Sequence, residues 1–413
     1  MNKAPMLTTQ EALDHLLAGA IAVSDCETVD TQQALGRVLA YDVASLVDVP
    51  PLDNTAMDGY AVRSVDVSSS GAILRISQRI PAGSLAGALE AGTAARIFTG
   101  APIPLGADAV IKQEECVVLE DEPGCVQFQV AAIPGQSIRR RGEDLTAGKI
   151  ALSAGTFLRP QELGVAASAG LTHLVVRRRV KVAIFFTGDE LALPGEELRP
   201  GAIYNSNRDT LVACLRSLGC EVSELGIVPD RLDATREALR RASKDHDLII
   251  TSGGVSVGEE DHIKPAVSAE GRLDLWQIAI KPGKPLAFGV VRKSAIPADG
   301  ESWFIGLPGN PVSSFITFLL FARPFILKLQ GRQQIDAPRY LMRADFDWPK
   351  ADRRNEFLRV KVNHRGGLDL FPNQGSGVLT SASWADGLVD CPSGKSFAAG
   401  DLVSFIPFSS LLS

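Results

Sequence analysis

Three short glycine-rich segments carry the most recognisable chemistry in this sequence. They follow apolar runs at residues 187–190 (Thr-Gly-Asp-Glu), 251–256 (Thr-Ser-Gly-Gly-Val-Ser) and 306–311 (Gly-Leu-Pro-Gly-Asn-Pro). Small residues leave backbone N–H groups open, and such groups bind phosphate and other oxyanions. One such turn is more often plain turn geometry, but three of them predict a phosphate-bearing ligand. The binding residues expected here are Thr187, Ser252, Gly253, Gly254, Ser256, Pro308, Gly309 and Asn310.

Neither common nucleotide-binding fingerprint is present. Residues 252–256 lack the lysine of a P-loop, and no G-x-G-x-x-G segment is followed by an acidic residue about twenty positions later. The pattern therefore excludes an ordinary P-loop NTPase and an ordinary dinucleotide-binding enzyme.

Carboxylates follow the same apolar runs. Asp189 and Glu190 come after the first run, Asp230 follows a run that ends at Val228, and Asp261 comes after the second glycine-rich segment. Together with a phosphate, such oxygens could hold Mg²⁺. Helix capping or a solvated turn is the alternative for each of them, and Asp261 precedes a predicted helix.

Two clusters of basic residues could hold an anion. Lys281 and Lys284 flank a Pro-Gly turn, and rigid lysines suit phosphate, although a solvated β-turn would have the same sequence. Arg139 and Arg141 lie in a run of three arginines next to Asp144, and arginines grip oxyanions through two hydrogen bonds. A bare charge run of this kind is more often a solvated face.

Two further loops in the first half of the chain carry polar groups. Residues 50–61 contain Asp53 and Asp58 among turn-forming residues, and residues 96–110 carry the hydroxyl of Thr99 in a turn of small residues. An ordinary loop crossing would explain the first of them equally well.

The elements that position these residues can be read from hydrophobic periodicity. Leu13, Leu16, Leu17 and Ile21 share one face of a helix that begins near Thr9, and a second helix is predicted over residues 31–39. Short apolar runs between residues 47 and 149 predict a compact β domain, and a helix begins at Pro160. Apolar strands then alternate with helices, and the chain past residue 331 is again β-rich.

We therefore predict a multidomain α/β and β fold. A central three-layer α/β/α domain with a mostly parallel sheet would be joined by an inserted β domain, a helical N-terminal element and a C-terminal β-barrel. The predicted boundaries are residues 1–46 with 146–178 for the helical N-terminal (dimerisation) domain, 47–145 for the insertion, 179–330 for the α/β domain and 331–413 for the barrel. Ligands of open α/β sheets bind at the carboxyl ends of the strands, where the glycine-rich segments lie.

Composition excludes several classes of protein. The 42 basic and 48 acidic residues give a net charge of −6, and aromatic residues make up 6% of the chain, so nucleic acid is not an expected partner. Arg323 and Pro324 interrupt the most apolar segment, residues 312–329, which favours a buried helix over a membrane span. The five histidines and six cysteines lack zinc-site spacing. With no visible export signal, we expect a cytoplasmic protein.

Six motifs occur together in one order. They are Asp53-Asn-Thr-Ala-Met-Asp58-Gly-Tyr-Ala, Phe98-Thr-Gly-Ala-Pro-Ile-Pro, Arg141-Gly-Glu-Asp144, Thr187-Gly-Asp-Glu190, Ser252-Gly-Gly-Val-Ser-Val-Gly and Leu307-Pro-Gly-Asn-Pro. Over essentially its whole length the chain resembles the molybdopterin molybdenumtransferase family, which includes MoeA and the gephyrin E domain. The resemblance implies an elongated homodimer of four-domain subunits, with an α/β domain related to molybdopterin adenylyltransferases.

The resemblance also implies a reaction. Mg²⁺-dependent cleavage of adenylylated molybdopterin would release AMP, while molybdenum from molybdate enters the pterin dithiolene. By similarity, Glu190 and Asp261 would organise metal and phosphate, and Ser376 would lie at the cleft. The full set of catalytic residues that it implies is Asp58, Thr99, Asp144, Glu190, Asp230 and Asp261. A molybdopterin adenylyltransferase and apo-molybdoenzymes or their chaperones would be partners.

Three positions depart from the family pattern. Gln277 stands where some relatives carry a lysine, Thr55 replaces a more usual serine, and Arg231 stands where a second aspartate is common. Two other functions remain open. An adenylyltransferase would need only a lone α/β domain, and a non-catalytic scaffold would be expected to carry a linker or an appended partner domain.

Overall fold

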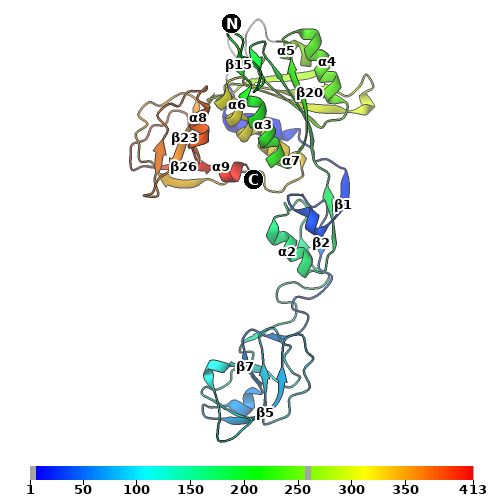
Figure 1. Cartoon of the computed structure of the whole chain (residues 1–413), viewed down its shortest axis with the longest axis vertical. Coiled ribbons are helices and arrows are strands. Elements are labelled where there is room, and N and C mark those ends of the chain that lie inside the picture. Colours follow the sequence, from blue (N-terminus) through cyan, green and yellow to red (C-terminus); the bar gives the residue numbers. More distant parts are fainter. Residues whose placement is uncertain (1–5, 256–261, 413) are drawn as a thin grey trace. The chain divides into compact units, whose positions relative to one another are not determined.

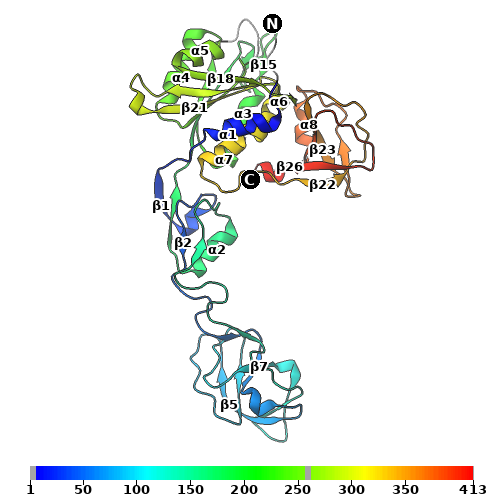
Figure 2. The ribbon, with the colours of Figure 1, turned by 180° about the vertical axis from the view of Figure 1, so that it is seen from behind.

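The structure is a computed structural model that describes residues 6–255 and 262–412. The chain folds into two compact units, each described here by itself. Unit 1 comprises residues 1–27, 36–38 and 177–413, and unit 2 comprises residues 28–35 and 39–176. Figures 1 and 2 show the ribbon from opposite sides. Because this partition does not separate the four predicted domains from one another, their boundaries stay a prediction.

Unit 1 contains a six-stranded sheet in the order β16-β13-β17-β21-β20-β18. The first four strands are parallel to one another, and the last two are antiparallel to their neighbours. The strands are β13 (Lys181–Thr187), β16 (Glu221–Val228), β17 (Leu248–Ser252), β18 (Gly271–Gln277), β20 (Pro285–Arg292) and β21 (Glu301–Leu307). The predicted mostly parallel sheet is thus confirmed, with two antiparallel strands at one edge.

Helices cover both faces of this sheet. Along β13, Ile184 and Phe186 pack into one core with α1, α3 and the 311–329 helix, whereas Ala183 and Phe185 pack into another with α4 and α5. This alternation is why the strands are apolar on both faces. The helices are α1 (Thr9–Ala18), α3 (Ser206–Ser217), α4 (Leu232–Ser243), α5 (Ile263–Glu270), α6 (Pro311–Thr317) and α7 (Arg323–Leu329).

The most apolar segment is a core helix. α6 and α7 are joined by η5 (Phe318–Ala322), a π-helical turn, into one helix of 19 residues. By length and composition it could cross a membrane, but 89% of its apolar window is buried inside the protein. Burial at this level supports the expectation of a core helix.

A second sheet of unit 1 lies in the C-terminal part of the chain. Its order is β19-β23-β25-β26-β22, with β24 paired to β23. β19 (Ile280–Lys281) runs parallel to β23, so the lysine turn that follows β18 joins this sheet as an edge strand. The other elements are β22 (Tyr340–Arg343), β23 (Asn355–Val362), β24 (Leu368–Leu370), β25 (Gly387–Cys391), β26 (Leu402–Pro407), α8 (Leu379–Trp384) and α9 (Phe408–Leu411).

Unit 2 is built on a sheet in the order β7-β4-β6-β5-β9-β8. Its strands are β4 (Gly59–Val62), β5 (Ile73–Ile80), β6 (Thr93–Ile97), β7 (Ala109–Lys112), β8 (Cys116–Val118) and β9 (Cys125–Phe128). Two short ladders pair β3 (Asn54–Thr55) with β10 (Ile138–Arg139) and β2 (Val43–Ala44) with β11 (Ile150–Leu152). The predicted helix at Pro160 is present as α2 (Pro160–Ser168).

Two predicted helical segments differ from the structure. α1 ends at Ala18 and is capped by Gly19, so Ile21 lies outside the helix and is 79% exposed instead of packed on its apolar face. The helix predicted over residues 31–39 is wrong. Only η1 (Thr31–Ala34), a 3₁₀ turn, forms there, and Gly36 takes a φ of +73°, which ends any helical path.

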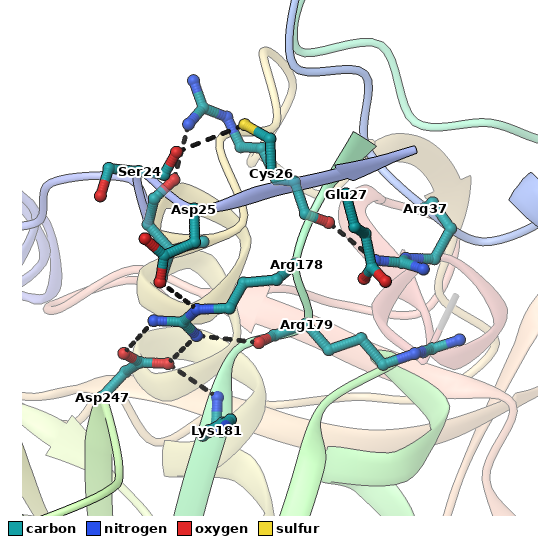
Figure 3. A network of polar contacts seen from close by, with 11 residues as sticks. Ser24, Asp25, Cys26, Glu27, Arg37, Arg178, Arg179, Lys181 and Asp247 are labelled. Carbon is teal, nitrogen blue, oxygen red and sulfur yellow. Dashed lines mark hydrogen bonds and ion pairs between the residues drawn. The ribbon is translucent and has the colours of Figure 1, made fainter. Parts of the chain in front are cut away.

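A partly buried ionic network connects the N-terminal segment of unit 1 to the sheet. Arg178 donates to both carboxylate oxygens of Asp247, at 2.7 and 2.8 Å, and also to Asp25 at 2.8 Å (Figure 3). The N–H of Lys181, at the start of β13, donates to Asp247 as well. Burial raises the pKa of Asp247, but these donors outweigh it and hold the pKa below its usual value.

Candidate functional site

The three glycine-rich segments line one cleft of unit 1 at the carboxyl ends of β13, β17 and β21. The cleft has a volume of about 620 Å³. The predicted residues that line it are Thr187, Glu190, Asp230, Gly253, Gly254, Lys281, Lys284, Pro308, Gly309, Asn310 and Ser376. Ser252 lines an adjoining pocket of about 340 Å³. Ser256 and Asp261 lie outside the described residues.

Glycines in the second segment allow its backbone to approach the first. Gly253 has a φ of +99°, and a Cβ there would lie 2.7 Å from the carbonyl oxygen of Thr187. At Gly254, with a φ of +63°, a Cβ would lie 2.7 Å from Ile263. The buried Oγ1 of Thr187 has no hydrogen-bond partner among the described residues. The N–H of Gly253 donates to the Leu307 carbonyl at 3.1 Å, so the Thr187 hydroxyl and the Gly254 backbone are the groups of this lining where a phosphate oxygen could bind.

Ser252 has a structural role in this arrangement. Its hydroxyl, on a residue that is 3% exposed, donates to the Pro308 carbonyl at 2.9 Å. Asn207 donates its side-chain amide to Ser252 Oγ at 2.9 Å and to the Gly309 carbonyl at 2.7 Å. These bonds tie the second and third segments together. Asn207 lies on α3, and no motif or spacing in the sequence points to it.

One wall of the cleft is cationic. Lys281 forms an ion pair with Glu356 at 2.6 Å, and Arg354 pairs with Asp352 at 2.9 Å, which raises the pKa of Arg354. Lys284 is exposed, and its ammonium group pairs with no described residue. Lys284 is therefore the cation of this wall best placed to pair with a ligand, and Arg354 is a cleft residue that sequence analysis missed.

The loop that carries Ser376 is held from the interior of the C-terminal sheet. Arg359, 1% exposed, accepts from Gln374 Nε2 at its carbonyl and donates its N–H to Gln374 Oε1. Its guanidinium donates to the carbonyl of Gly375 at 3.2 Å, and burial lowers its pKa to about 10. Ser376 in turn accepts from the N–H of Val312 at the start of α6. These contacts from Arg359 and Val312 hold the loop at the cleft.

Two carboxylates in the cleft suit a hard divalent ion. Glu190 and Asp230 both line it, and the N–H of Asp230 lies 3.4 Å from Asp189 Oδ1. No cluster of three metal-ligating side chains occurs within residues 6–255 and 262–412. Mg²⁺ commonly takes one or two carboxylates and completes its shell with water and substrate phosphate, so this donor set fits it.

Unit 2 brings Asp58 and Thr99 together. One oxygen of Asp58 accepts from both the N–H and the hydroxyl of Thr99, at 2.7 Å each. The hydrogen bond from the Thr99 backbone N–H is the main reason why the pKa of Asp58 lies below its usual value. Asp58 is therefore a carboxylate in ordinary conditions, and the Thr99 side chain is exposed beside it.

The arginine run of unit 2 is partly engaged in ion pairs. Arg141 pairs with Asp48 at 2.6 Å, and Arg140 pairs with Asp53 at 2.6 Å. Arg139 and Asp144 are exposed. The alternative interpretation, a charged solvated face, thus describes part of this run, because Arg141 braces its own loop.

Comparison with known proteins covers nearly all of the chain. Residues 7–170 match the MoeA N-terminal region (domain I and II), residues 183–328 a probable molybdopterin binding domain, and residues 342–408 the MoeA C-terminal region (domain IV). The molybdopterin molybdenumtransferase of Haemophilus influenzae is 37% identical, over 98% of this chain and 100% of the relative. This chain belongs to the molybdopterin molybdenumtransferase family.

Other relatives agree. A molybdopterin molybdenumtransferase of Nostoc is 35% identical over 90% of this chain and 86% of its own length. The crystal structure of a molybdopterin biosynthesis MoeA protein from Pyrococcus horikoshii has a TM-score of 0.83 and 29% identity, covering 98% of this chain and all of that one. The predicted family, its enzyme class and its multidomain fold are confirmed.

The departures from the family pattern have local explanations. Thr55 is buried and its hydroxyl donates to the Met57 carbonyl at 2.6 Å, a turn contact that a serine could also make. Arg231 precedes α4 and pairs with Asp233 at 3.2 Å. Gln277 ends β18, opposite Pro285. In this member of the molybdenumtransferase family, none of the three lines the described cleft.

Proposed function

We propose that this protein transfers molybdenum from molybdate to adenylylated molybdopterin, with Mg²⁺, and releases AMP. The observation that carries the proposal is a single cleft with three kinds of wall: glycine backbone beside the Thr187 hydroxyl, carboxylates, and the ammonium group of Lys284, which pairs with no described residue. Each wall suits one part of this reaction.

The glycine-rich wall suits the phosphate end of the substrate. Gly253 and Gly254 line the cleft next to the Thr187 hydroxyl, for which the described part of the chain offers no hydrogen-bond partner. Asn310, the residue before α6, lines the same cleft. These groups would orient the adenylyl phosphate, which leaves as part of AMP when its bond to the rest of the substrate breaks.

The acidic wall suits Mg²⁺. Glu190 and Asp230 would hold the ion, and Asp261, outside the described residues, remains a proposed ligand with Glu190. When bound, Mg²⁺ would neutralise charge on the phosphate oxygens. The carboxylates themselves orient that charge and keep the ion next to the glycine-rich segments.

The cationic wall suits molybdate, which is an oxyanion. Lys284 and Arg354 would supply charge-assisted hydrogen bonds, and the hydroxyl of Ser376 would supply a neutral donor. No protein thiol is required, because the pterin dithiolene brings its own sulfur ligands. Within unit 2, Arg139 and Arg141 remain proposed anion contacts.

The proposal extends to the assembly. By its family, the protein would act as a cytoplasmic homodimer, with Asp58, Thr99 and Asp144 of unit 2 among the catalytic residues. It would take its substrate from a molybdopterin adenylyltransferase and pass its product to apo-molybdoenzymes or their chaperones.

The test is AMP release. Purified protein is incubated with adenylylated molybdopterin, molybdate and Mg²⁺, and AMP is followed by chromatography. We expect molybdate-dependent release that falls by about 100-fold or more in Glu190→Gln. Glu197→Gln is the control, since Glu197 is an exposed carboxylate close in sequence that does not line the cleft. Substrate that binds without AMP release would contradict the proposal and favour a scaffold.

A further inference from the structure

The Asp58–Thr99 pair sits where three strands of unit 2 end side by side. Gly59 of β4 lies opposite Ile97 of β6 and Lys112 of β7. Asp58 just before β4 and Thr99 just after β6 are therefore brought together by strand register. The strands are very close here, because a Cβ on Gly59 would lie 2.0 Å from the carbonyl oxygen of Ile111.

Arg96 braces the Asp58 side of this pair. Its Nη1 donates to the carbonyl of Gly59 at 2.9 Å, and its Nη2 donates to Gln113 Oε1 at 2.6 Å. The backbone N–H of Gln113 donates to the Asp58 carbonyl at 3.1 Å. One guanidinium thus fixes the backbone of Asp58 in two ways. It binds the carbonyl of Gly59, the next residue, and it binds Gln113, whose N–H donates to the Asp58 carbonyl.

The same guanidinium also braces the Thr99 side. Its carbon lies 4.6 Å from the ring centroid of Phe98, the residue before Thr99, and 5.2 Å from that of Tyr60. Only a planar group with several donors in a fixed fork can stack on these rings and donate to two acceptors at once. A lysine would keep the charge but lose this combination.

Arg79 provides an internal comparison. It lies opposite Arg96 in the β5–β6 ladder, and its guanidinium is also 4.6 Å from the Phe98 centroid. Its side chain is exposed and makes no hydrogen bond or ion pair to a described residue. Arg79 therefore shares the charge, the ring and the strand face, but not the contacts to Gly59 and Gln113.

We infer that Arg96 is a positioning residue that holds the Asp58 carboxylate against the amide and hydroxyl of Thr99. The consequence for turnover rests on the proposed function, in which Asp58 and Thr99 take part in the reaction. The consequence for local structure is independent of the proposed function, because the hydrogen bond from the Thr99 N–H to Asp58 can be measured without substrate.

The experiment combines hydrogen–deuterium exchange with kinetics in the full-length protein. In Arg96→Met, we expect the Thr99 amide to exchange about tenfold faster, with kcat for AMP release reduced about 10- to 100-fold and KM for molybdate nearly unchanged. Arg96→Lys should show the same changes to a smaller degree, and it also serves if the methionine variant fails to fold. Arg79→Met should leave exchange and kcat within about twofold of the parent protein.

The outcomes separate this inference from the proposed function. Unchanged Thr99 exchange in both Arg96 variants, or equal effects of Arg79→Met, would overturn the inference. Faster exchange with an unchanged kcat, in a protein that Asp58→Asn inactivates, would show that Arg96 holds the pair but would overturn its consequence for turnover. If Asp58→Asn stays fully active, the proposed role of Asp58 is wrong, while exchange at Thr99 still decides whether Arg96 holds the pair.

Discussion

Lys281 Nζ lies 2.6 Å from a carboxylate oxygen of Glu356, and this ion pair joins the α/β part of unit 1 to its C-terminal sheet. The Glu356 side chain is 3% exposed, and the indole N–H of Trp348 donates to its other oxygen at 3.0 Å. The two charged residues are also opposite each other in the β19–β23 ladder. A lysine that the sequence assigns to ligand binding therefore fixes one wall of the cleft.

Removing that lysine should destabilise the protein. Lys281→Met would leave the buried Glu356 carboxylate without its partner, and we expect the free energy of unfolding to fall by about 1–3 kcal/mol. Lys284→Met is the matched control and should change it by less than about 0.5 kcal/mol, because Lys284 is exposed. Urea denaturation measures both free energies of unfolding. An equal decrease in the two variants would show that the ion pair of Lys281 with Glu356 does not stabilise the protein.

Removing Lys284 should affect the use of molybdate and not the stability of the protein. Loss of a charge-assisted contact to molybdate is worth about 1.5–3 kcal/mol, so the molybdate concentration for half-maximal AMP release should rise about 10- to 100-fold in Lys284→Met. The comparison is Lys350→Met, which removes an exposed lysine that does not line the cleft. A molybdate dependence that is identical in the two variants would remove Lys284 from the anion site.

The glycine segments and the lysine turn were predictable because their signals are local. An apolar strand that ends in small residues places Thr187, Gly253 and Asn310 at one sheet edge whatever the rest of the chain does. Arg354 carries no such signal. It reaches the cleft only because the two-residue strand β19 pairs with β23, a contact between segments about seventy residues apart.

Other errors have equally specific causes. Periodicity predicted a helix through Gly36, where a left-handed backbone ends it. Anion binding by the run of three arginines stays a prediction, and a charge count could not reveal that Asp48 pairs with Arg141 and Asp53 with Arg140. The roles proposed for Ser256 and Asp261 concern residues outside those described.

Close approach at Gly253 should make substitution there costly. Gly195 has nearly the same backbone, with a φ of +97° against +99°, but a Cβ at Gly195 meets nothing within 4 Å. Gly195→Ala should therefore cost only backbone strain, about 1 kcal/mol, whereas Gly253→Ala adds a collision with Thr187 and should cost about 1–3 kcal/mol more. Thermal denaturation of the two variants checks this, and a Gly253→Ala protein as stable as Gly195→Ala would refute the close packing of the two loops.

Acid should weaken the contribution of Asp247 to stability. Its folded pKa lies below its unfolded value, because hydrogen bonds from Arg178 and Lys181 outweigh the effect of burial. The contribution is therefore complete above the unfolded pKa of about 4 and is lost as pH falls through the folded pKa. Asp247→Asn should lose about 2–4 kcal/mol at pH 7, and this difference from the parent protein should shrink below about pH 4.

Asp25→Asn is the control for that measurement. Asp25 pairs with the same Arg178, but its side chain is 68% exposed, so its loss should cost at most about 1 kcal/mol. A difference between Asp247→Asn and the parent protein that stays constant from pH 7 to about pH 3 would contradict the assignment of charge to Asp247.

The central claim is that one cleft holds the AMP-capped dithiolene and molybdate together. Anomalous diffraction at the molybdenum edge, from crystals soaked with adenylylated molybdopterin, molybdate and Mg²⁺, tests it most directly. We predict molybdenum beside Lys284, Arg354 and Ser376, with the adenylyl phosphate beside Thr187 and Gly254. Molybdenum or nucleotide bound away from these residues would contradict the account.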